Sequence, residues 1–188
     1  MSTTTSTLPV KKISTGRIAL LLTLGTESVF FVTLLVAYAA LREQVVWDVP
    51  HTLPRTAIPL VNTSILLASA LVAWRAHVAI RRGRQSGLRG GLLIALLLGL
   101  LFVIGQIYEF SHAGLHIDDP SLGGVFFTLM GSHAVHVLAG VVFLALNLMR
   151  TCLGDFTAER HEAIELGTWF WYYVTAVWVV LFVELYVV

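Results

Sequence analysis

Cysteine and charged residues are both scarce in this sequence, and each scarcity excludes a class of structure. The single cysteine, Cys152, cannot form an internal disulfide or a cysteine-based metal site. Charged residues make up only 12% of the 188 residues and the net charge is +1, so a nucleic-acid-binding surface is not expected. Internal repeats and low-complexity tracts are also missing. The chain is instead 57% hydrophobic with a mean hydropathy of +0.83, which indicates an integral membrane protein.

Five apolar runs are each long enough to cross a bilayer as a helix, which takes about 20 residues. We therefore expect an all-α fold, a single domain of five transmembrane helices that follows a flexible cytoplasmic tail over residues 1–17. The helices are predicted at residues 18–41, 57–74, 91–110, 123–149 and 164–188. The first run does not indicate a secretory signal, because it is longer than a signal core and no small-residue cleavage site follows it.

Lysine and arginine are distributed unevenly between the two sides of the predicted bundle. Ten of the twelve fall in the tail, the second loop and the fourth loop, and the second loop, residues 75–89, contains five arginines and no acid. By the positive-inside rule, the N-terminus is predicted to be cytoplasmic and the C-terminus to lie outside.

Three ionisable side chains lie near the middle of predicted spans. A charge at the bilayer centre costs about 2.5 to 3.5 kcal/mol, so Glu27 is expected to be protonated, paired or hydrated. It serves either proton handling and polar coupling or helix packing, and the sequence leaves both open. His133 and His136 are spaced i, i+3 and share one face of the fourth span.

Haem or metal ligation is the sharper hypothesis for the two histidines of the fourth span. Two haems would need four axial side chains, however, and this span alone offers histidines at depth. We therefore predict hydrogen bonds to neighbouring helices, with Ser132 and Thr128 as local partners and with Gly131 and Gly140 allowing close helix approach. No catalytic, cofactor or metal site is predicted in this chain.

Further polar and aromatic side chains lie toward the ends of the third and fifth spans. Gln106 and Glu109 share a face at the outer end of the third span, where a solvated helix end and a functional contact are both open. His161 and Glu165 are spaced i, i+4 and are predicted to pair. A cluster of aromatic residues lies too deep for a simple interfacial belt, so it predicts a protein interface. Its members are Trp169, Trp171, Tyr172 and Trp178.

Five ordered motifs resemble subunit III of the haem-copper terminal oxidases, in its short five-helix bacterial form. They are GTESVFF, IPLVNTSILLASALVAW, GLLFVIGQIYEF, FFTLMGSHAVHVLAG and HEAIELGTWFWYYVTAVW. The resemblance covers nearly all of residues 18–188. It implies a multi-pass protein of the bacterial inner membrane, without redox centres of its own, that belongs to an oxidase complex.

The resemblance also implies partners and roles. The expected partners are subunit I, which holds the haems and copper and reduces dioxygen, together with subunit II and membrane lipids, including bound phospholipid. The chain would support proton uptake and catalytic lifetime through its buried polar network. This network comprises Glu27, Gln106, Glu109, His133, His136, His161 and Glu165.

Two departures from the family pattern affect what the resemblance implies. The family commonly has a histidine and an aspartate where this chain has Tyr172 and Thr175, so any polar link made there is altered. Larger members have seven helices, and the lipid-holding cleft between their first two helices and the other five cannot be assumed here.

Alternative functions stay open at this point. An accessory subunit of a quinol oxidase or a nitric oxide reductase is a close variant, because other subunits determine the electron donor. A haem-carrying cytochrome b membrane anchor is the alternative from another class. A small transporter is disfavoured, because the sequence shows no inverted repeat and no broken helices.

Overall fold

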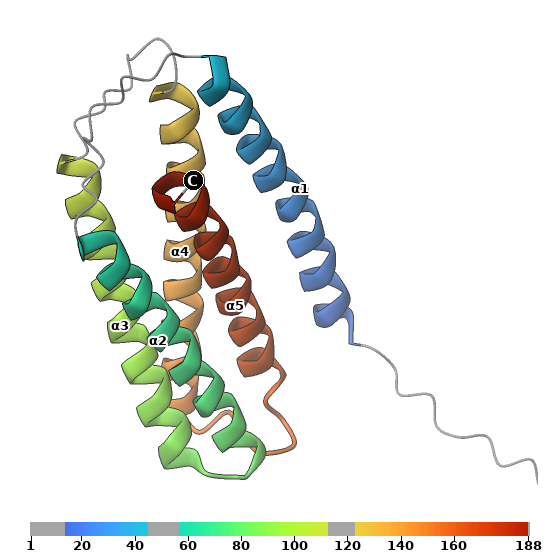
Figure 1. The fold of residues 1–188 in the computed structure, drawn as a ribbon. Coiled ribbons are helices and arrows are strands. Elements are labelled where there is room, and N and C mark those ends of the chain that lie inside the picture. The colour runs from blue at the N-terminus through green and yellow to red at the C-terminus, as the bar shows by residue number, and fades with distance from the viewer. Residues whose placement is uncertain (1–13, 45–56, 113–122, 188) are drawn as a thin grey trace, which may run out of the picture.

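The computed structural model describes residues 14–44, 57–112 and 123–187, and its ordered elements are helices. They are α1 (Thr15–Gln44), α2 (Ala57–Arg81), α3 (Gln85–His112), α4 (Gly123–Cys152) and α5 (Glu162–Phe182), which continues as a π-helical turn over Val183–Val187 (Figure 1). All five are long and apolar enough to span a membrane, and no strand occurs in the described segments. The predicted all-α, five-span fold is confirmed, and the chain is a multi-pass membrane protein.

Several helices extend beyond their predicted ends, most clearly around the arginine-rich loop. Residues 75–89 were expected to form that loop, yet α2 continues to Arg81 and α3 begins at Gln85. No glycine or proline interrupts the chain from Trp74 to Arg81, and long arginine side chains can reach water from a helix end. Gly83 follows with a φ of 71°, a left-handed conformation that favours glycine and turns the chain. Most of residues 1–17 lies outside the described residues, but α1 already includes residues 15–17.

The helices α2 and α3 form a closely packed antiparallel pair (Figure 1). Small residues permit this approach: a Cβ added at Gly91 would lie 2.7 Å from the Cβ of Ala76, and one at Gly105 would lie 2.5 Å from Oδ1 of Asn62. The pair packs against α4 and α5, whereas α1 contacts only α4 and α5 within the described residues. Half of the described side chains of α1 are exposed, and its buried members are Phe31 and Tyr38.

Two tryptophans of α5 form the centre of the bundle, which corrects one prediction. Trp171 and Trp178 are each 0% exposed. Nε1 of Trp171 donates to Oγ of Ser69 at 3.2 Å, and Nε1 of Trp178 donates to Oγ1 of Thr63 at 3.0 Å. The prediction that these two tryptophans form a surface for a partner protein is therefore wrong. These two tryptophans lie deep in the span because they belong to the core of this chain.

Most of the positive charge collects at one end of the bundle. This end contains the start of α1, the end of α2, the start of α3, the end of α4 and the start of α5 (Figure 1). Among the described arginines, Arg42 alone lies at the opposite end. The prediction that the N-terminus is cytoplasmic rests on this uneven distribution of positive charge. The orientation of the bundle in the membrane itself stays a prediction.

Candidate functional site

Glu27 of α1 meets His136 of α4 near the middle of both helices. Oε2 of Glu27 lies 3.1 Å from Nε2 of His136, and Nδ1 of His136 lies 2.7 Å from the carbonyl oxygen of Ser132. Because a carbonyl only accepts, Nδ1 carries a hydrogen. A hydrogen bond between Nε2 and Oε2 then requires one further proton, carried by either of these two atoms. The two side chains are 17% and 32% exposed, for His136 and Glu27 respectively. The pair can therefore move one proton between an acid and a base.

His133 does not join the pair formed by Glu27 and His136, although it lies on the same helix face as His136. Its side chain is buried, and its ring stacks on Trp178 at 5.2 Å between centroids. Both of its ring nitrogens lack a hydrogen-bond partner among the described residues. The local partners predicted for the histidines also differ, because Oγ1 of Thr128 donates to Gly124 and Ser132 contributes its carbonyl rather than its hydroxyl. His133 is thus part of an aromatic core.

Gln106 and Glu109 are buried on α3 rather than solvated at its end. Each is 6% exposed, and Nε2 of Gln106 donates to Oε2 of Glu109 at 3.1 Å. Oε1 of each residue has no hydrogen-bond partner within the described segments. Gln106 and Glu109 are therefore not part of a solvated helix end in the isolated chain. A functional contact, the other predicted role, stays open.

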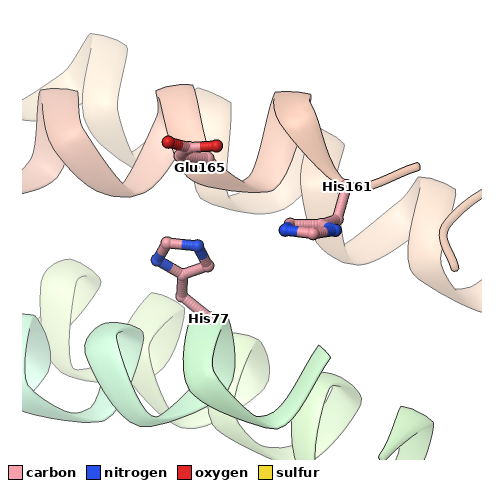
Figure 2. A group of neighbouring side chains, drawn as sticks. All are labelled: His77, His161 and Glu165. Carbon is pink, nitrogen blue, oxygen red and sulfur yellow. The ribbon is translucent and has the colours of Figure 1, made fainter. Parts of the chain in front are cut away.

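His161 and Glu165 lie near each other but do not form the predicted pair. Glu165 instead forms an ion pair with Arg17 of α1, with 2.7 Å between Oε2 and Nη2. His161 directly precedes α5, and it faces His77 of α2 at 6.0 Å between ring centroids (Figure 2). Sequence reasoning missed both His77 and Arg17. The sequence could have placed His77 on a helix, because no glycine or proline after Trp74 ends α2 before that position.

Trp169 and Tyr172 remain as candidates for the predicted partner interface, since both are partly exposed. The hydroxyl of Tyr172 is buried and has no partner in the part of the chain that is described. Thr175 donates from Oγ1 to the carbonyl oxygen of Trp171 at 2.8 Å, within its own helix. At these two departures from the family pattern, neither side chain forms a polar link to another helix within the described residues.

Comparisons with known proteins agree on one family. The family model described as Cytochrome c oxidase subunit III matches residues 4–188. Cytochrome c oxidase subunit 3 of Mus musculus is 37% identical over 129 residues, which are 69% of this chain and 49% of the mouse protein. The Spodoptera frugiperda protein of the same name is 37% identical over 129 residues, covering 69% of this chain and 88% of that protein. The chain spans about half the length of the mouse relative.

Proposed function

Because the chain belongs to the cytochrome c oxidase subunit III family, we propose that it is an accessory subunit of a haem-copper terminal oxidase. In this role it supports dioxygen reduction and proton uptake by the catalytic subunit, and it carries out no redox step itself. Its proposed partners are subunit I, subunit II and membrane lipids, including bound phospholipid. The bacterial inner membrane stays a prediction, because the relatives named above are animal proteins.

The observation that carries the proposed proton-support role is the contact between Glu27 and His136. An ionisable side chain inside a span is costly unless it is paired, and here a carboxyl group and an imidazole satisfy each other. The pair is neutral overall in either proton arrangement, so it tolerates the low dielectric while retaining a proton that can be exchanged.

The packing of the two histidines supports placing the haems and copper in partner subunits. An axial haem ligand needs an accessible ring nitrogen and a flat cavity beside it. The ring of His133 is stacked on Trp178 and meets the edge of Phe31, while both nitrogens of His136 lie against oxygen atoms. The residues present therefore do not fit a haem, which counts against the cytochrome b anchor.

The proposed function is tested by purifying the complex through an affinity tag on this chain. We expect a haem-containing subunit to copurify, and we expect the haem absorption to be unchanged per complex in His133→Ala. A haem band that stays with the isolated polypeptide and disappears in His133→Ala would contradict the proposal. The copurified subunits also separate a cytochrome c oxidase from a quinol oxidase or a nitric oxide reductase, since those subunits hold the electron-donor site.

Trp169 is the tryptophan of the predicted interface cluster that remains partly exposed. We expect Trp169→Ala to weaken retention of the partner by about tenfold, because partly exposed aromatic anchors dominate interface energies. The measurement is the fraction of partner retained during detergent washing of the tagged complex. Trp74→Ala is the matched control, because Trp74 is an exposed tryptophan of α2 that lies outside the predicted interface cluster of α5. Equal retention in wild type and in Trp169→Ala would show that Trp169 faces lipid.

A further inference from the structure

Three side chains that bind metals in other proteins converge at the arginine-rich end of the bundle. They are His77 near the end of α2, His161 just before α5, and Glu165 in the first turn of α5 (Figure 2). One ligand atom from each lies within 4.8 Å of the others, and all three residues are partly buried. Within the described segments, these residues form the one such group of three or more.

The donor set suits a divalent transition metal ion. Two imidazole nitrogens and one carboxylate oxygen match the ligand preferences of Zn²⁺, whose bonds to nitrogen and oxygen are about 2.0 to 2.2 Å long. Tetrahedral bonds of that length place ligand atoms about 3.4 Å apart. The observed separations exceed this by at most about 1.4 Å. Side-chain torsions of two histidines and a glutamate can close this difference without moving the helices.

His161 has no other role that the described structure assigns to it. It occupies the N-cap position of α5, yet its side chain forms no capping hydrogen bond. Its Nδ1 atom is buried and lacks a partner among the described residues. The two histidine rings are tilted by 49° rather than stacked, so ring stacking does not explain their approach. A buried polar atom without a partner is costly, and a metal ion would satisfy it.

Arg17 modulates the site formed by these three residues. Its guanidinium contacts Oε2 of Glu165 at 2.7 Å, which orients the carboxylate and leaves Oε1 for a metal ion. Its positive charge also repels a cation and competes for the same carboxylate. Arg17 is therefore a positioning residue that limits affinity.

We propose that His77, His161 and Glu165 bind a divalent transition metal ion of the Zn²⁺ type, which links the end of α2 to the start of α5. This inference goes beyond the accessory role and departs from the sequence-based expectation that the chain holds no metal. The ion would join two helices that are neighbours in the bundle but distant in sequence, so it would stabilise the folded state. The proposed accessory role does not depend on this metal site, because it rests on the family match and on the contact between Glu27 and His136.

The test uses the copurified complex, stripped of loosely bound metal with a chelator and then titrated with Zn²⁺ in equilibrium dialysis. Zinc is quantified by elemental analysis, which distinguishes it from the iron and copper of partner subunits. We expect the wild type to bind one more zinc per complex than His77→Gln or His161→Gln, or to bind that zinc at least about tenfold more tightly. His112→Gln is the matched control and should equal the wild type, because His112 is an exposed histidine at the other end of the bundle. Equal zinc binding in the wild type and both site variants would overturn the proposal.

Arg17→Gln separates a metal site from a purely structural cluster. Removing the competing cation should tighten zinc binding by about threefold or more, whereas a packing role for the histidines predicts no such gain. Zinc should also raise the melting temperature of the wild-type complex but not that of His161→Gln. Equal zinc binding in the wild type and in Glu165→Gln would show that Glu165 is not a ligand and would overturn the site as stated. A complex that loses this zinc and keeps its partners and turnover leaves the accessory role intact.

Discussion

Replacing Gly140 of α4 by alanine is expected to destabilise the bundle by about 2 kcal/mol or more. The added Cβ would lie 2.5 Å from Cε3 of Trp171, which is far inside van der Waals contact. The indole cannot retreat, because a Cβ at Gly99 would already lie 3.0 Å from its opposite edge and Ser69 holds its Nε1 atom. The change is measured as the shift in unfolding midpoint of the detergent-solubilised chain.

Gly131→Ala is the matched control for Gly140→Ala, because Gly131 lies on the same helix. A Cβ added there would meet nothing within 4 Å in the described structure. Alanine is the better helix former by about 1 kcal/mol, so this variant should be neutral or more stable. If both substitutions destabilise equally, helix flexibility rather than the fit of Trp171 explains the glycines.

Replacing Glu27 by alanine is expected to leave the complex assembled but to make its turnover decay faster and its proton uptake slower. The substitution removes the carboxyl group whose Oε2 atom faces Nε2 of His136. The imidazole then has no partner at Nε2 inside a span. Loss of a hydrogen bond that involves a charged group costs about 1.5 to 3 kcal/mol, which corresponds to a change of about tenfold or more in an equilibrium constant. The measurements are the half-life of turnover and the proton-uptake rate of the purified complex.

Two further variants separate a functional role of Glu27 from simple packing. His136→Ala should reproduce the defect, and the double variant should be no worse than either single one, because the two residues act as a unit. Thr33→Val is the matched control on α1, since Oγ1 of this exposed threonine bonds only its own helix, at Val29. Unchanged proton uptake and lifetime in Glu27→Ala would leave Glu27 as a packing residue.

The sequence predicts the helices well but their contacts poorly. Hydropathy identifies the five spans because each must cross the same apolar layer, and the positions of Glu27 and His136 at mid-span follow directly. Their pairing does not follow, because it depends on which faces of α1 and α4 meet. At Gly140 the close neighbour is the indole of Trp171 rather than the backbone of another helix, and a Cβ added at Gly131 would meet nothing within 4 Å in the described residues.

The two misjudged regions have physical causes. A deep tryptophan is equally suited to a core and to an interface with another protein, so periodicity alone could not show that Trp171 and Trp178 face inward. His77 was assigned to a loop because of the arginines around it, and no local pattern connects it with His161 across 84 positions of sequence. Arg17 was assigned to the tail, and its contact with Glu165 is likewise tertiary.

The sparse packing of α1 has a consequence for its height in the membrane. An apolar helix against lipid slides along its axis at little cost, so something else must fix its axial register. Polar contacts at three levels do so, with Arg17 on Glu165, Glu27 on His136, and Arg42 on the carbonyl oxygen of Glu184 at 3.2 Å. A slip of α1 by one residue would move each of these three contacting side chains by about 1.5 Å along the helix axis and rotate it by about 100°. One residue inserted between Arg17 and Glu27 would change the angle between their side chains by about 100°, so they could no longer contact Glu165 of α5 and His136 of α4 at the same time. The spacing of Arg17 and Glu27 therefore fixes how this helix is inserted.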